Sequence, residues 1–160
     1  MSLSAELSLD VPFTDWRHET VINIVHTANR LAQVGSSLLR RFDLTEAQFN
    51  LLFVLKYSNG NVTQSDLGKR LVVTRASITS LVDKMEEKGL VQRLDVPGNR
   101  RIHHVSFTPQ GRALVDAIEP QYRKVVHATV SGLRKEDCEV LTRHLDRVRE
   151  KTTQMLGEEL

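Results

Sequence analysis

The sequence contains a single cysteine, Cys138, so no disulfide can form within one chain. No apolar run approaches the roughly 20 residues that a membrane-spanning helix requires. The N-terminus also lacks the basic and then apolar order of a secretory signal. These absences predict a reduced, cytoplasmic protein without a membrane partner. At 160 residues the chain is long enough for one domain with a buried core and a helical appendage.

Signatures of enzymes and metal centres are missing as well. The sequence has no nucleophile elbow, no phosphate-binding loop and no helix-borne pair of histidine ligands. Of the six histidines, only His103 and His104 are adjacent, and adjacent side chains of a strand face opposite ways. The neighbours of Cys138 are Asp137 and Glu139, whose charges disfavour a reactive thiolate. We therefore expect no catalytic residue, no cofactor and no bound metal, with a metal-responsive regulator kept as an alternative.

The chain has almost no net charge, but its basic residues are unevenly distributed along the sequence. The net charge is +2, yet residues 63–104 carry eight Lys and Arg against five Asp and Glu, an excess of three. The segments on either side are close to neutral. A local basic excess of this kind is typical of a surface that binds nucleic acid.

Apolar spacing predicts a chain of helices. Residues 1–13 show no sustained period and are expected to form an N-terminal tail, whereas a three- and four-residue spacing predicts a long helix from Thr14 to about Arg41. Three threonines, Thr45, Thr63 and Thr74, are then placed to cap three successive helices. The helix after Thr74 is the best defined, because it has one apolar stripe, made of Ile78, Leu81, Val82 and Met85, and ends at Gly89.

A short strand pair follows, predicted at residues 90–94 and 102–107 around an Arg-rich turn. Thr108 and Pro109 then open another helix, which Pro120 should kink, and a last helix begins near Lys135. The expected fold is mainly α with a small β-hairpin wing. Its winged helix-turn-helix core spans residues 43–108, and residues 14–42 and 109–157 form a helical dimerisation region.

The order of helix, turn, helix and hairpin predicts that the helix after Thr74 enters the major groove of double-stranded DNA. The hydroxyl groups of Ser and Thr and one Arg guanidinium can hydrogen-bond to base edges in the major groove. Arginines near a hairpin tip can enter a narrow minor groove. Basic side chains nearby can contact phosphates. The predicted DNA-binding residues are Thr74, Arg75, Ser77, Thr79, Ser80, Lys84, Asn99, Arg100 and Arg101, with Lys69, Arg70 and Lys88 as further phosphate contacts.

The stretch from Leu81 to Gly111, LVDKMEEKGLVQRLDVPGNRRIHHVSFTPQG, resembles the signature of the MarR family of bacterial regulators, and the order of elements over residues 14–156 is also similar. The resemblance implies a homodimeric repressor that a small aromatic or phenolic effector releases from a palindromic operator. This chain departs from the family at the wing. Asn99 stands where the family usually has Asp before its Arg pair, and the loop from Asp95 is one residue longer.

The long helices are too apolar to be covered by so small a core, which also predicts self-association. Four residues on or near the first long helix are candidates for the effector cleft, namely Trp16, His18, His26 and Arg30, with Trp16 and Arg30 combining stacking and charge. The alternative from another class is a DNA-binding architectural or interaction module without an effector.

Overall fold

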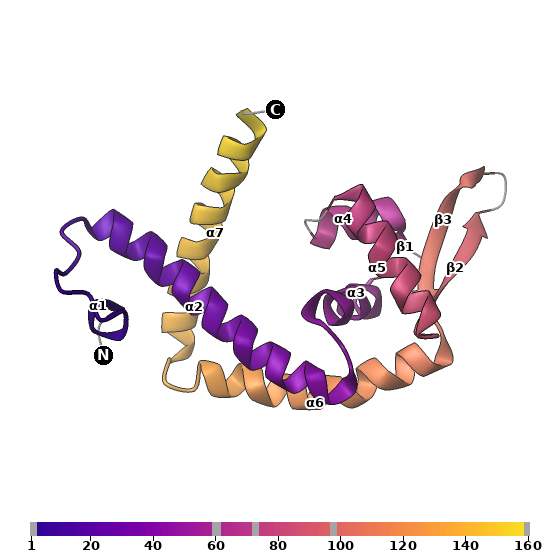
Figure 1. Cartoon of the computed structure of the whole chain (residues 1–160), viewed down its shortest axis with the longest axis horizontal. Helices are drawn as coiled ribbons and strands as arrows, with labels where there is room; N and C mark the ends of the chain where they lie inside the picture. Colours follow the sequence, from indigo (N-terminus) through magenta and orange to yellow (C-terminus); the bar gives the residue numbers. More distant parts are fainter. Residues whose placement is uncertain (1–2, 59–61, 72–73, 97–98, 159–160) are drawn as a thin grey trace. The chain divides into compact units, whose positions relative to one another are not determined.

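The computed structural model describes residues 3–58, 62–71, 74–96 and 99–158, with the side chains of residues 75, 96, 99–102 and 158 left outside the described part. Its contacts divide the chain into two compact units, Met1–Tyr122 and Arg123–Leu160. Figure 1 traces the elements in chain order. The fold is mainly helical with a small antiparallel sheet, which confirms the predicted fold class.

The first unit begins with a short helix α1 (Leu3–Glu6), followed by the long helix α2 (Trp16–Leu39) and a 3-10 turn η1 (Arg40–Phe42). Asp15 caps α2, since its carboxylate accepts a hydrogen bond from the Arg17 backbone N–H at 2.9 Å. The long helix therefore lies where the apolar spacing predicted it. The expected tail contains one helical turn that the sequence pattern did not predict, and its Leu3 is buried.

The three predicted threonine caps are all present. Helix α3 (Glu46–Lys56) opens with a full capping box, in which Thr45 and Gln48 each accept the other's backbone N–H, at 3.3 and 3.0 Å. Helix α4 (Gln64–Leu71) follows Thr63, whose hydroxyl accepts from the Asp66 N–H at 3.1 Å and donates to the Asp66 carboxylate at 2.7 Å. In this capping motif the Asp66 carboxylate binds the Thr63 hydroxyl and not the Thr63 backbone N–H, because Asp is shorter than the usual Glu or Gln.

Helix α5 (Arg75–Glu87) lies beside a sheet of three antiparallel strands in the order β1-β3-β2. The strands are β1 (Val62–Thr63), β2 (Val91–Val96) and β3 (Asn99–Phe107). The hairpin of β2 and β3 was predicted with shorter strands, and β1 was not predicted at all. Its two residues pair with β3, Val62 opposite Val105.

One hydrophobic core joins α3, α4, α5, the sheet and the first turns of α6 (Pro109–Thr129). The predicted stripe of α5 supplies three fully buried side chains, Ile78, Val82 and Met85, and a partly buried Leu81. Burial of these apolar side chains is the main term that holds α5 in place. The face of α5 opposite the stripe is consequently directed away from the core.

Thr108 joins the sheet to α6. Its hydroxyl accepts from the Gly111 N–H at 3.0 Å, which caps the helix as predicted, and donates to the Gly89 carbonyl at 2.6 Å. A Cβ on Gly111 would lie 1.9 Å from the Leu90 carbonyl oxygen, so only glycine fits this contact. The α6 assignment continues through Pro120, and the kink expected there stays a prediction.

The second unit contains α7 (Lys135–Glu158), which begins at the predicted residue. Asp137 accepts hydrogen bonds from both the backbone N–H and the guanidinium of Arg134, at 3.1 Å each. The Arg134 side chain and backbone lower the pKa of Asp137 below its usual value of 3.8. No helix in the described ranges is long and apolar enough to cross a membrane.

Candidate nucleic-acid interface

Helix α5 is fixed at both ends. At its start the Thr74 hydroxyl accepts the Ser77 N–H at 3.2 Å and lies 2.8 Å from the Ser77 hydroxyl. At its end Gly89 adopts a left-handed φ of 67°, and the Leu90 N–H donates to the Met85 carbonyl at 2.9 Å. These caps and the buried stripe hold the outward face of α5 in one orientation.

The outward face carries small side chains. The predicted DNA-binding residues of this helix whose side chains are described are all exposed, namely Thr74, Ser77, Thr79, Ser80 and Lys84. Ala76, which was not predicted, is also exposed. The signal that could have found Ala76 is its helical spacing of four residues from Ser80. Arg75 is the first residue of α5, but its side chain lies outside the described residues, so its role stays a prediction.

An ionic network that the sequence interpretation missed joins α5 to the wing and to α4. The Arg93 guanidinium on β2 binds Asp83 at 2.6 Å and also binds the Glu86 carboxylate. Gln64 accepts from Arg93 Nε at 3.4 Å and donates to the Thr79 hydroxyl at 2.7 Å. The single guanidinium offsets part of the negative charge of these two α5 carboxylates, and it ties α5 to β2.

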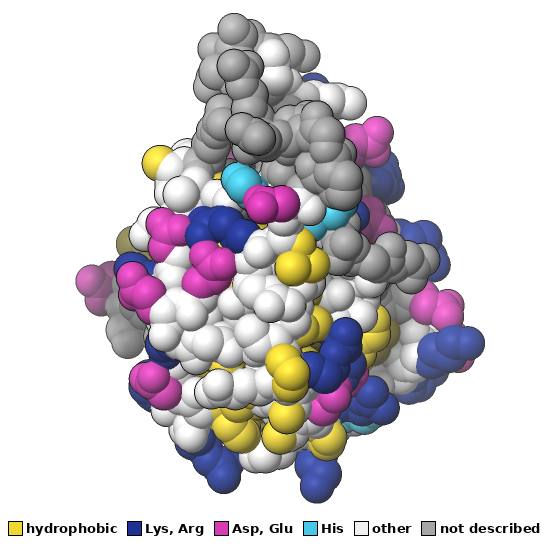
Figure 2. Space-filling view, turned by 90° about the vertical axis from the view of Figure 1, so that its right-hand side faces the viewer, with side chains coloured by type: hydrophobic (Ala, Val, Ile, Leu, Met, Phe, Trp, Pro, Cys, Tyr) yellow, Lys and Arg dark blue, Asp and Glu magenta, His cyan; other side chains and the backbone are white. Residues whose placement is uncertain are grey.

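Around this network no single sign of charge dominates. On the side of the molecule that Figure 2 shows, acidic and basic side chains are interspersed over the described surface. Two of the predicted phosphate contacts also have protein partners. Lys88 binds the Asp43 carboxylate at 2.7 Å, and Arg70 donates to the Ser58 hydroxyl at 2.6 Å. Lys69 and Lys84 are exposed.

The wing differs from its predicted form. Arg100 and Arg101 were expected in the turn, but the structure places their backbone within β3. The register moves from Asp95 opposite His103 to Val96 opposite Asn99, so residues 100–102 have no one-to-one partner on β2. The side chains of Asn99, Arg100 and Arg101 lie outside the described residues, and their DNA contacts stay predictions.

The four candidate effector residues do not form one cluster. The Arg17 guanidinium, and not that of Arg30, lies over the Trp16 ring, 4.4 Å from its centroid. His18 packs edge-on against Phe13 at 5.5 Å. The adjacent Arg17 therefore covers one face of the Trp16 ring, and effector contacts of Trp16 and His18 stay predictions.

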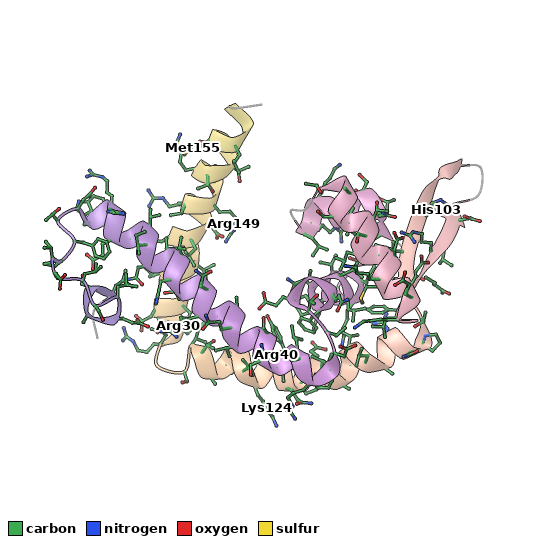
Figure 3. All side chains as sticks on the ribbon, viewed as in Figure 1. Arg30, Arg40, His103, Lys124, Arg149 and Met155 are labelled. Atoms are coloured by element: carbon green, nitrogen blue, oxygen red, sulfur yellow. The ribbon has the colours of Figure 1, made fainter. Side chains whose placement is uncertain are left out.

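His26 and Arg30 do come together, on one side of α2. The Glu6 carboxylate of α1 lies 2.9 Å from the Arg30 guanidinium and 3.7 Å from His26 Nε2. Figure 3 labels Arg30 on α2. These two residues therefore already hold one carboxylate, which the sequence pattern could not indicate because Glu6 lies 24 residues before Arg30.

A second ionic cluster connects α3 to α6. Lys56 lies 2.6 Å from Asp116 and also binds Glu119, which accepts a hydrogen bond from the Tyr57 hydroxyl. Hydrogen bonds from Lys56 to Asp116 and then to Glu119 raise the pKa of Lys56 above 10.5. The cluster anchors α6 to α3 of the winged core.

Metal ligation finds no support in the described residues, where no group of three or more His, Cys, Asp and Glu could hold an ion. His103, labelled on β3 in Figure 3, pairs with Asp95 across the hairpin at 3.1 Å. Cys138 is half-buried on α7.

Three short helices with a capped, outward-facing α5 and an antiparallel hairpin define a winged helix-turn-helix protein. The comparisons with known proteins give the family. A profile of the MarR family matches residues 42–102. The HTH-type transcriptional regulator MhqR of Bacillus subtilis is 30% identical over 110 residues, which cover 69% of this chain and 75% of MhqR.

Solved structures agree. AbsC, a MarR family regulator from Streptomyces coelicolor, superposes with a TM-score of 0.79 at 22% identity, covering 90% of this chain and 99% of AbsC. A mutant MarR from E. coli, complexed with operator DNA, superposes with a TM-score of 0.74 at 24% identity, covering 84% and 99%. The chain belongs to the MarR family of DNA-binding transcriptional regulators, which is not a family of enzymes.

Proposed function

We propose that this chain is a repressor that binds a near-palindromic operator as a homodimer, with α5 of each protomer in a major groove. The observation that carries the proposal is the outward face of α5. It is fixed by caps at both ends and bears only small side chains over its first described turn, from Ala76 to Ser80. Such a face allows close approach to base edges. The MarR protein bound to operator DNA has the same fold, which supports this placement.

Two protomers are inferred from the apolar side chains that the long helices expose. On α2, Val21, Val25 and Leu31 are each about half exposed, at 55%, 52% and 49%. On α7, Leu141, Val148 and Met155 are also exposed. An apolar stripe along a helix requires a covering surface, and a two-fold pair of equal chains supplies one. A two-fold dimer in turn requires two operator half-sites in inverted repeat.

Effector control is proposed at His26 and Arg30. These residues hold the Glu6 carboxylate, so they have the charge and geometry to hold a carboxylate or phenolate of a small aromatic effector in its place. Exchange of Glu6 for the effector would release α1 from α2. The effector acts only if it binds the DNA-free spacing of the two recognition helices more tightly than the DNA-bound spacing.

The DNA part is tested by measuring binding of purified full-length protein to selected and scrambled duplexes. Arg75→Ala should lose discrimination by about 1 to 3 kcal/mol, whereas Lys84→Ala should weaken binding to all duplexes alike. Retained discrimination in Arg75→Ala would place the base-reading face elsewhere.

The wing is tested by the double variant Arg100→Ala and Arg101→Ala. Its affinity should fall most on operators with A·T-rich flanks, because a narrow minor groove attracts arginine. Equal loss on every flank would contradict minor-groove insertion. DNA binding that shows no preference for inverted repeats would instead favour an architectural module.

A further inference from the structure

Three hydroxyl groups on the first turns of α5, those of Thr74, Ser77 and Thr79, have hydrogen-bond partners within the protein. The Thr74 and Ser77 hydroxyls lie 2.8 Å apart, and Thr74 also accepts the Ser77 N–H. The Thr79 hydroxyl accepts from the Gln64 side-chain amide at 2.7 Å. Gln64 is in turn held by Arg93 of the wing strand. These hydrogen bonds fix the rotamers of the hydroxyl side chains and direct the Thr79 oxygen toward α4.

The same turn also exposes methyl groups beside its hydroxyls. Ala76 is exposed, and its only side-chain group is a methyl. Thr79 lies three residues further on and is also exposed, so Ala76 and Thr79 occupy neighbouring positions on the helix surface. Because the Thr79 oxygen binds Gln64, its methyl is available to the face that the proposed function directs into the groove.

We infer that Ala76 and Thr79 are specificity-determining residues that recognise the C5-methyl group of thymine. This inference rests on the proposed function, because it requires α5 to lie in a major groove. Thymine is the one unmodified base that presents a methyl there, and apolar side chains discriminate it by contact. Gln64 acts as a positioning residue, since its hydrogen bond to the Thr79 hydroxyl fixes the rotamer that sets the direction of the Thr79 methyl.

The test uses a duplex selected from a random library by the purified full-length protein. Each thymine of one half-site is replaced in turn by deoxyuridine, which removes the C5-methyl and leaves every hydrogen-bonding group in place. Deoxyuridine should weaken binding about fourfold, the value of one buried methyl-sized group, at each of two neighbouring positions, one contacted by Thr79 and one by Ala76. Replacements at the remaining positions of the half-site should have no effect.

Two variants of Thr79 test whether its methyl group causes the preference for thymine over deoxyuridine. Thr79→Ser keeps the hydroxyl and lacks the methyl, so at one sensitive position it should bind thymine and deoxyuridine equally well. Thr79→Val keeps a methyl and lacks the hydroxyl, so it should still prefer thymine there. Ala76→Gly should abolish the preference at a neighbouring position, and circular dichroism confirms that each variant is folded.

The outcomes separate this inference from the proposed function. If the selected duplex is preferred over a scrambled one but no deoxyuridine replacement weakens binding, methyl recognition is wrong and the operator-binding proposal stands. Undiminished thymine preference in both Thr79→Ser and Ala76→Gly would also overturn it. If no duplex is preferred over a scrambled one, both proposals fail together.

Discussion

The winged region and the long helices differ in how far their apolar side chains are buried. From α3 to the start of α6, the large apolar side chains meet in one core, in which Leu52, Val82 and Ile118 are fully buried. On α2 and α7 the stripes stay largely exposed, as Val25 and Met155 illustrate. Burial of apolar surface is the dominant favourable term in folding. The winged region therefore completes its own core, whereas the long helices leave apolar side chains exposed, which is the basis of the proposed dimer.

Gly111 and Gly132 give the sharpest test of this difference, because one lies at a tight contact of the winged region and the other lies in the second unit. Gly111→Ala should destabilise the protein by about 4 kcal/mol or more, since the new Cβ would meet the Leu90 backbone oxygen at 1.9 Å. Gly132 has no atom within 4 Å of an added Cβ. Gly132→Ala should therefore change the free energy of unfolding by less than about 0.5 kcal/mol. Chemical denaturation of the two variants measures both values, and equal losses would contradict the expected contrast.

The exposed stripe of α2 should control assembly and not the fold of the winged region. The double variant Val25→Asp and Leu31→Asp should raise the dimer dissociation constant at least about a hundredfold, or roughly 3 kcal/mol, because two charges would be buried without partners. Sedimentation over a range of protein concentrations measures this constant, and circular dichroism reports the retained fold.

The matched control for assembly is Gln33→Asp, which adds the same charge at an exposed position of α2 away from the stripe. It should leave the dimer intact. A protein that sediments as a monomer before any substitution would show that the stripe is not a dimer interface.

The Lys56 cluster should set how firmly α6 is joined to the winged region. Lys56→Met keeps the aliphatic stem and removes the cation, which leaves Glu119, only 15% exposed, without its ammonium partner. We expect a loss of about 2 kcal/mol in the free energy of unfolding. Because the pKa of Lys56 is raised, wild-type protein should keep this contribution at neutral pH and lose it only as the pH rises above 10.5. The exposed Lys69→Met is the control, and an equal loss there would contradict a specific role of the cluster.

The parts of the fold that the sequence predicted are those that local chemistry specifies. Thr45, Thr63 and Thr74 cap their helices through groups three residues away, so short-range patterns were sufficient. Strand β1 was missed because two residues carry no periodic signal, and its pairing of Val62 with Val105 spans 43 residues. A pattern of alternation within one segment cannot reveal such a partner.

In the candidate site, too, local patterns predicted single residues but not contacts between separate elements. Helical spacing placed the exposed residues of α5, and it could also have placed Ala76. It could not show that Arg93 binds Asp83 and Glu86, or that Gln64 engages Thr79, because each contact joins separate elements. Spacing also could not show that the Arg17 guanidinium lies over the Trp16 ring, because that contact depends on side-chain conformation.

Asp137 gives the smallest expected effect and tests whether α7 depends on its own cap as well as on a partner. Asp137→Asn should lower the unfolding temperature slightly at pH 7, because it removes the carboxylate that accepts from the Arg134 backbone and guanidinium. The pKa of Asp137 is lowered in the folded protein, so the contribution is complete above 3.8 and is lost as the pH falls through the lowered value. Thermal scans should thus show wild type and variant converging in acid. Asp146→Asn, which removes a carboxylate paired with Arg149 and not with a backbone N–H, is the control. A difference for Asp137→Asn that persists unchanged in acid would assign the effect to packing and not to the charge of the cap.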